Sequence, residues 1–350
     1  MFSLKKGMKG SRFLLFAFFC CCVFSFTLKE LIPSPFYQPK YWPKPSYDFK
    51  GNPLDGDKFE LGRALFYDPI LSRDSSISCA SCHLQFTAFA HVDHPTSHGI
   101  EGRIGKRNAP GLANLAWRKL FHWDGGVINL NAQAINPITH VAEMDMRLDS
   151  LMYRLDRSPI YSAAFKRTFG TTDIRPFHLV KALAQFTVSL VSANSKYDKV
   201  MRAEDNQVFT EQESKGMVLF TKFCSSCHKP PFFGGDDFKY NGLLLDPELL
   251  DFGRMTITGN KRDSLLFMVP TLRNIEYSFP YMHDGRISKL KDVIKHYTLL
   301  DYSSPLLSKE LRKNPVRLSD NEQKDLLAFL KTLTDKTFLF DERFKYATLK

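Results

Sequence analysis

Two copies of one short motif carry most of the recognisable chemistry in this 350-residue sequence. The copies consist of Cys79, Cys82 and His83, and of Cys224, Cys227 and His228. The pattern Cys-x-x-Cys-His is typical of c-type haem attachment: two thiols add to the haem vinyl groups, and the adjacent imidazole reaches the iron. A redox dithiol or a zinc site also uses cysteine pairs. Two complete copies favour two covalently bound haem c groups.

The other three of the seven cysteines lie in the first 28 residues, near the start of the chain. There, four basic residues precede an apolar run from Phe13 to Phe26, which is the pattern of an export signal. The run is short for a membrane span, which needs about 20 apolar residues. We therefore expect a periplasmic protein whose residues 1–28 are a cleaved signal peptide. An uncleaved N-terminal anchor and a lipoprotein, either of which would tether the chain to the membrane, are the alternatives.

The two motifs belong to a longer internal repeat. Each follows a Gly-x-x-Leu-Phe segment and precedes a Pro-x-Leu-x-Asn segment, and ten residues after that Asn comes Asp-Gly. The matching segments are residues 62–66 and 216–220, 110–114 and 270–274, and 124–125 and 284–285. A repeat of this length indicates two copies of one domain.

The repeat predicts a mainly α fold made of two cytochrome c-like domains, each with one covalent haem. We expect an N-terminal domain at 29–205, a C-terminal domain at 206–340 and a tail at 341–350, with the boundary in the polar stretch 202–207. Hydrophobic periodicity predicts helices, the last of them capped by Ser319, and no strong alternating strand pattern is present. The helical stretches are 148–168, 175–191, 290–299 and 319–335.

The repeat differs at one position that could hold a second iron ligand. Tyr297 lies thirteen residues after Asp284, whereas Pro137, which has no side-chain donor, lies thirteen residues after Asp124. This difference predicts one closed haem and one haem open to a small oxidant. The candidate ligands for the closed haem are Tyr297, Met282, Met268, His283 and His296.

Several residues between the motifs could serve the open haem. Glu143 could act as an acid or base on bound peroxide, with Gln133 beside it, although a solvated surface glutamate is the simpler interpretation. Trp123 could relay electrons between the haems or could be an ordinary core residue. The histidine-rich loop 90–107 could close the first haem reversibly, but surface histidines are the default; its candidates are His91, His94 and His98.

These residues resemble the bacterial di-haem cytochrome c peroxidase family, which includes MauG-type enzymes, over about residues 55–335. The resemblance depends on both haem motifs and on five further segments: Asn108–Pro110, Trp123–Gly125, Asn136–Pro137, Glu143–Met144, and Pro270–Asn274 continuing through Pro280–Gly285.

The resemblance implies a role for each matching residue. His83 would be the proximal ligand of the peroxidatic haem, with Gln133 and Glu143 on its distal side, and His228 the proximal ligand of the electron-transfer haem. Trp123 would lie between the haems. Asn108 and the carbonyls of Ser278 and Pro280 would hold one calcium ion, although threonine is usual where Ser278 stands. At the second haem, conventional peroxidases of the family have Met as the distal ligand and MauG-like members have Tyr. Tyr297 therefore favours the MauG-like branch and makes Met282 the weaker candidate.

The implied activity is reduction of hydrogen peroxide to water with electrons from a small cytochrome c or copper protein. Two alternatives remain: a MauG-like enzyme that oxidises residues of a partner protein, and a non-enzymatic di-haem electron carrier. The formal net charge is +11, but no Lys/Arg run with interleaved aromatic residues points to nucleic acid. A basic face could instead steer an acidic redox partner.

Overall fold

The computed structural model describes residues 35–349, which lie within one compact unit, Ser34–Lys350. The predicted export signal at residues 1–28 lies outside the described residues. Among the residues that are described, no helix is long and apolar enough to cross a bilayer.

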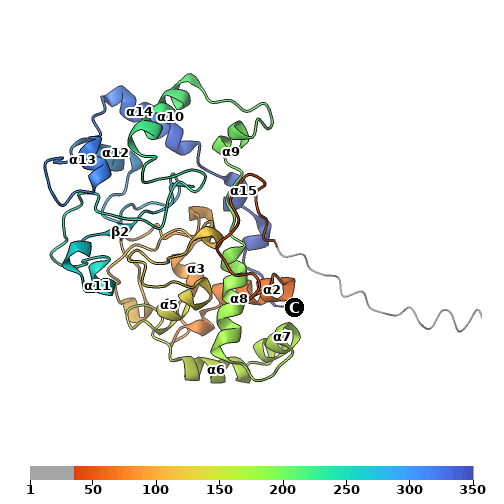
Figure 1. Ribbon diagram of the computed structural model, residues 1–350. Helices are drawn as coiled ribbons and strands as arrows, with labels where there is room; N and C mark the ends of the chain where they lie inside the picture. The colour runs from red at the N-terminus through yellow and green to blue at the C-terminus, as the bar shows by residue number, and fades with distance from the viewer. Residues whose placement is uncertain (1–34, 350) are drawn as a thin grey trace, which may run out of the picture. The chain divides into compact units, whose positions relative to one another are not determined.

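The described chain is mainly helical, with long loops and one two-stranded antiparallel sheet, which confirms the predicted class of secondary structure (Figure 1). In the sheet, Phe238 of β1 (Phe238–Lys239) pairs with Met268 of β2 (Phe267–Met268). The α-helices are α2 (Gly56–Tyr67), α3 (Cys79–Cys82), α4 (Leu130–Gln133), α5 (Ile135–Thr139), α6 (Leu148–Arg157), α7 (Pro159–Phe169), α8 (Pro176–Val188), α9 (Lys196–Met201), α10 (Glu211–Phe223), α11 (Met255–Thr258), α12 (Leu290–Thr298), α13 (Lys309–Lys313), α14 (Asp320–Lys331) and α15 (Lys336–Leu339). Short 3-10 helices are η1 (Pro69–Leu71), η2 (Gln85–Thr87), η3 (Ile100–Gly102), η4 (Leu115–Trp117), η5 (Lys261–Asp263) and η6 (Glu342–Phe344).

Two helix pairs frame the two haem motifs. Helix α2, which precedes the first motif in the sequence, packs on α8. Helix α10, which precedes the second motif, packs on α14 in the same way (Figure 1). The repeated glycine explains how close each pair comes. A Cβ on Gly62 would overlap the carbonyl oxygen of Ala182, and one on Gly216 would overlap that of Asp325. The Gly-x-x-Leu-Phe repeat is therefore a helix-packing signal.

The ends of these helices follow ordinary capping chemistry. Thr210 and Ser319 form capping boxes with Glu213 and Glu322, so each pair satisfies backbone donors at the start of α10 and α14. The predicted cap at Ser319 is confirmed. Asp55 caps α2 by accepting a hydrogen bond from the Lys58 backbone N–H at 2.8 Å.

Three predicted helices differ from the observed ones. The predicted helix 175–191 ends three residues early, at Val188. The stretch 148–168 is divided into α6 and α7, because Ser158 caps a new helix and Pro159 occupies its first position, where a missing N–H costs nothing. The predicted helix 319–335 ends at Lys331, and Asp335 caps the short α15 that follows.

Three groups of buried side chains form the core. The first surrounds α2 and α8, and it includes Phe338, Leu339 and Phe344 from the end of the chain. The second surrounds α10, α12 and α14, and the third lies under the N-terminal segment that carries Trp42. The fully buried Arg273 donates to both carboxylate oxygens of Asp198 at 2.7 and 2.8 Å, and its guanidinium lies 4.8 Å from the Trp42 ring.

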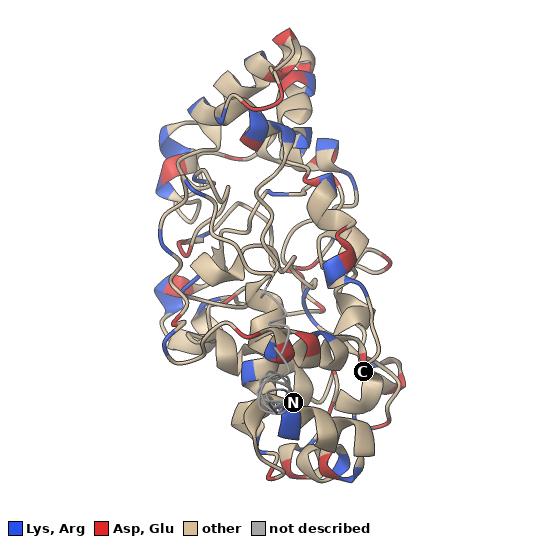
Figure 2. Ribbon diagram, turned by 90° about the vertical axis from the view of Figure 1, so that its right-hand side faces the viewer, with Lys and Arg blue, Asp and Glu red and all other residues tan. Residues whose placement is uncertain are grey.

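Lys and Arg residues are interspersed with Asp and Glu residues along the ribbon in the view of Figure 2. Many of them pair locally. Lys215 and Glu211 lie one helical turn apart on α10, 2.6 Å from each other, and Lys239 contacts Glu310 at 2.8 Å. Exposed pairs of this kind contribute little stability, so the fold depends mainly on its apolar cores.

Candidate active site

A single cavity of about 750 Å³ connects the two haem motifs. Its walls include Cys82 and His83 from the first motif and Cys224, Cys227 and His228 from the second. Cys79 is half-buried at the edge of the first core and is not part of the wall. None of the four described cysteines forms a disulfide.

The first motif holds its histidine in one defined orientation. His83 closes the single turn of α3, and its Nδ1 lies 2.7 Å from the carbonyl oxygen of Phe89. A carbonyl oxygen can only accept, so Nδ1 carries the proton and Nε2 presents a lone pair. Burial lowers the pKa of His83 to about 4, which keeps the imidazole neutral. A neutral ring with Nδ1–H bonded to the backbone is the form that binds a metal through Nε2.

The second motif repeats this arrangement. His228 Nδ1 lies 3.1 Å from the Phe233 carbonyl oxygen and 3.2 Å from that of Pro270. Burial lowers the pKa of His228 to about 4. Burial also raises the pKa of Cys79 and of Cys224 to about 12, so these thiols stay protonated. They are therefore poor metal thiolates, and the neutral imidazoles are the ready donors.

Helices α4 and α5 bring the predicted distal residues to the wall of the first half. Gln133 and Glu143 both line the cavity, as does Pro137. Gln133 Nε2 lies 3.5 Å from His122 Nε2. Burial raises the pKa of Glu143, and His140, whose Nδ1 lies 3.9 Å from Glu143 Oε1, partly offsets this effect.

Tight backbone turns fix the position of Glu143. Its N–H donates to the His140 carbonyl at 3.0 Å, and its own carbonyl accepts from the Ile100 N–H at 2.9 Å. The loop that follows the first motif is thereby tied to the turn that carries the carboxylate. Glu143 is thus a half-buried acid with a raised pKa on the cavity wall, a combination suited to proton transfer.

Trp123 lies on the same wall and is fixed at both its side chain and its backbone. Its indole N–H donates to the Asn108 carbonyl at 2.9 Å, and its carbonyl accepts from the Met268 N–H at 2.8 Å. The Asn108 N–H in turn donates to the His283 carbonyl at 2.7 Å. Asn108, Ser278 and Pro280, the predicted calcium donors, all line the cavity.

Arg107 connects two aspartates that come from different repeats. It donates to Asp124 at 2.5 Å and to Asp251 at 2.6 and 2.8 Å, and all three residues line the cavity. His283 stacks on Phe267 with ring centroids 3.7 Å apart. These contacts join segments from both repeats around Trp123.

In the second half, Tyr297, Met282, Met268 and His283 line the cavity. His296 does not, and its Nε2 instead lies 3.1 Å from the Asn241 carbonyl oxygen. Burial raises the pKa of Tyr297, while a hydrogen bond from the Asn241 side chain opposes the rise. Tyr297 therefore lies on the same cavity wall as His228.

The histidines of the loop after the first motif form a stack of their own. The His94 and His98 ring centroids are 4.0 Å apart, and those of His91 and His94 are 5.5 Å apart. None of the three lines the cavity, although the neighbouring Ala90 and Ser97 do.

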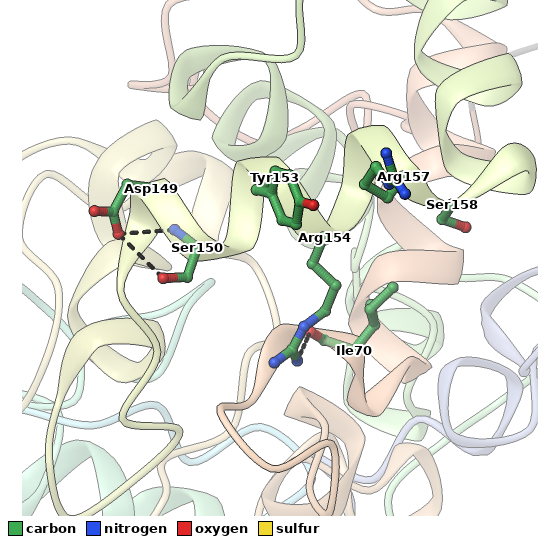
Figure 3. Close-up of a pocket in the computed structure, with 7 residues that line it drawn as sticks. All are labelled: Ile70, Asp149, Ser150, Tyr153, Arg154, Arg157 and Ser158. Carbon is green, nitrogen blue, oxygen red and sulfur yellow. Dashed lines mark hydrogen bonds between the residues drawn. The ribbon is translucent and has the colours of Figure 1, made fainter.

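A second hollow, of about 790 Å³, lies along α6 and is separate from these residues (Figure 3). Arg154 is its central cation, but the guanidinium donates to the carbonyls of Ile70 and Ser72 at 2.9 and 2.6 Å. Neither cysteine nor histidine lines this hollow. Arg154 therefore anchors η1 to α6, and the chemistry lies in the other cavity.

Sequence reasoning did not identify four of the side chains around this cavity: Arg107, His122, His140 and Asn241. Two had a usable signal, since His122 adjoins Trp123 and His140 stands three residues before Glu143. Arg107 and Asn241 had no such signal, because Asp251 and Met282, which they contact, lie 144 and 41 residues away in the sequence.

Comparison with known proteins shows what the chain is similar to. Residues 56–206 match a family model described as di-haem cytochrome c peroxidase. The chain is 35% identical over 309 residues to the methylamine utilization protein MauG of Methylorubrum extorquens, covering 85% of this chain and 83% of that protein. It is 34% identical over 285 residues to cytochrome c551 peroxidase of Nitrosomonas europaea, covering 81% of each. A crystal structure of a MauG-like protein associated with microbial copper homeostasis is similar, with a TM-score of 0.79 and 31% identity over 88% of this chain and 97% of the other.

Proposed function

The chain belongs to the di-haem cytochrome c peroxidase and MauG family and is a haem peroxidase, and on this premise we propose that it reduces hydrogen peroxide to water in the periplasm with electrons from a small cytochrome c or copper protein. The observation that carries the proposal is the single cavity in which both haem motifs meet Glu143 and Trp123. A non-enzymatic electron carrier would have no use for a proton-transfer residue there.

In this proposal each half of the chain, at about 29–205 and 206–340, holds one haem. Cys79 and Cys82 would attach the first, and Cys224 and Cys227 the second. His83 and His228 would hold the two irons, because each Nδ1 faces a backbone carbonyl and leaves Nε2 as the donor nitrogen. When bound, the two haems supply the redox chemistry, in which one peroxide, two electrons and two protons become two water molecules.

The protein's own groups would handle the protons. Glu143 in its carboxylate form accepts a proton from one peroxide oxygen and returns it to the departing oxygen. The Gln133 amide, adjacent to His122, orients the bound oxidant by hydrogen bonding. Pro137 offers no donor atom, so this half of the cavity stays open to a small molecule.

Trp123 would support electron transfer between the two halves, and one calcium ion would stabilise its surroundings. The Asn108 side chain and the carbonyls of Ser278 and Pro280 supply only oxygen donors, which suits a hard cation. The Asn108 carbonyl already accepts the indole N–H, so an ion at Asn108 would be coupled to Trp123.

A MauG-like role, oxidation of residues in a partner protein, is the second candidate. It is favoured by the position of Tyr297 on the cavity wall and by the 35% identity to a MauG protein. Ferrocytochrome turnover separates the two functions: a peroxidase is expected to oxidise a small reduced cytochrome rapidly, whereas a protein-modifying enzyme is expected to do so poorly.

Electron paramagnetic resonance of the ferric protein, with and without peroxide, tests the enzyme proposal. We expect one high-spin and one low-spin haem, both altered by peroxide, and a changed low-spin signal in Tyr297→Phe. Two low-spin signals that do not change when peroxide is added would contradict the proposal. An unchanged low-spin signal in Tyr297→Phe would refute the ligand assignment alone.

A further inference from the structure

Asn241 lies among the candidate distal ligands of the second haem. It follows β1 by two residues and lines the cavity. Its Nδ2 lies 3.4 Å from the Met282 sulfur, and Tyr297 lines the same cavity. One amide therefore contacts one of the competing ligand side chains and shares the cavity with the other.

The orientation of this amide is fixed from two directions. Asn241 Oδ1 accepts the Leu243 backbone N–H at 3.1 Å, which turns the NH₂ group toward Met282. The Asn241 carbonyl lies 3.1 Å from His296 Nε2, which ties this loop to α12, the helix that carries Tyr297. The two N–H donors of the amide match the sulfur and the phenol oxygen in number and in kind.

The internal repeat gives Met282 a counterpart in the first half. Met282 and His122 occupy equivalent positions two residues before the Asp of each Asp-Gly turn, and both have left-handed backbones, with φ of 75° and 69°. His122 is contacted by the Gln133 amide at 3.5 Å. In both halves a side-chain amide thus meets the residue that this turn presents to the cavity.

We propose that Asn241 is a positioning residue that selects Tyr297 over Met282 as the distal ligand of the second haem. One N–H binds a lone pair of the thioether sulfur and so makes the sulfur a weaker metal ligand, while the other N–H supports the phenol oxygen. The inference rests on the proposed function, because it assumes that Tyr297 ligates the iron. The inference adds a reason why Met282, which lines the same cavity, does not ligate the iron.

The test compares Asn241→Leu with the wild-type holoprotein by ferric paramagnetic resonance, near-infrared absorption and potentiometric titration of the second haem. Methionine ligation raises the reduction potential of a haem. We therefore expect Asn241→Leu to show a thioether charge-transfer band, a smaller tyrosine-type signal and a higher potential. Asn241→Asp, which keeps the shape and the acceptor for Leu243 but loses both donors, should also show the thioether band if the leucine variant does not fold.

A double variant separates selection from a general structural effect. In a Met282→Leu background, Asn241→Leu should produce no thioether band and no rise in potential. Asn314→Leu, which removes a half-buried amide outside the cavity, should leave all three readouts unchanged.

Two outcomes would overturn the inference: Asn241→Leu and Asn241→Asp both with wild-type spectra, or a rise in potential that persists without Met282. If Tyr297→Phe leaves the low-spin signal unchanged, the ligand assignment itself is wrong. If that variant alters the signal while the Asn241 variants do not, only the role of Asn241 fails.

Discussion

Among single residues, Glu143 combines a raised pKa with a position on the cavity wall. Its carboxylate form is the one that accepts a proton, and this form is lost as the pH falls through the pKa. Because burial raises that pKa above the ordinary 4.5, the acid limb of peroxidase activity should lie above the usual glutamate range.

We expect Glu143→Gln to lower the peroxide reaction rate by roughly 100- to 10,000-fold and to abolish this acid limb. The measurement is a pH profile of the bimolecular rate with peroxide, taken by stopped flow. The control is Glu101→Gln, because Glu101 is exposed and pairs with Arg73 and Arg103. This variant should keep the wild-type rate with peroxide and the acid limb of the pH profile. An unchanged profile in Glu143→Gln would rule out Glu143 as the base.

Trp123 and Trp117 form a matched pair for testing electron transfer. Both are buried and both donate the indole N–H to a carbonyl, but only Trp123 lines the cavity. We expect Trp123→Phe to delay the peroxide-induced change of the low-spin haem relative to that of the high-spin haem. Trp117→Phe should leave the two changes simultaneous. Rapid-freeze resonance spectra would show the order, and equal timing in both variants would remove Trp123 from the path.

Among the helices, the repeated glycines determine how closely each pair approaches. Alanine in a helix gains about 1 kcal/mol over glycine, but overpacking costs about 1–3 kcal/mol, and here the obstacle is a backbone carbonyl that cannot rotate away. We therefore expect Gly62→Ala and Gly216→Ala each to lower the free energy of unfolding by up to about 2 kcal/mol, measured by denaturant titration. Gly235→Ala is the control, because its Cβ would meet no atom closer than 3.9 Å. Equal stability in all three variants would refute the packing role.

Local sequence signals predict where the helices are better than they predict which residues contact each other. The haem motifs, the Ser319 cap and the repeated Gly-x-x-Leu-Phe segments of α2 and α10 are recognisable in the sequence because their signals lie within a few residues. The division at Pro159 was missed because the periodicity of 148–168 continues through the break. The Arg107–Asp251 pair spans 144 residues, and Asn241 meets Met282 across 41, distances over which spacing carries no information.

At the scale of the whole molecule, the end of the chain completes the first core. Phe338 is 2% exposed and packs with Phe89, 5.8 Å between ring centroids, whereas Phe340 on the same segment is 56% exposed. Phe338→Ala should therefore destabilise the protein by about 3–5 kcal/mol, and Phe340→Ala by well under 1 kcal/mol. Thermal unfolding of the two holoprotein variants, followed by circular dichroism, would show the difference. Similar losses in both would mean that the segment does not support the core.

This returning segment affects the order in which the chain folds as it is made. The portion that carries Cys79 leaves the ribosome early, but the side chains that close the core around it, Phe338 and Phe344, come last. Until then we expect the first half to remain loosely structured, with both thiols within reach of the machinery that would load a porphyrin. Late closure of the first core thus leaves time for haem attachment. A chain truncated before Phe338 would lack the side chains that complete the core of its N-terminal half.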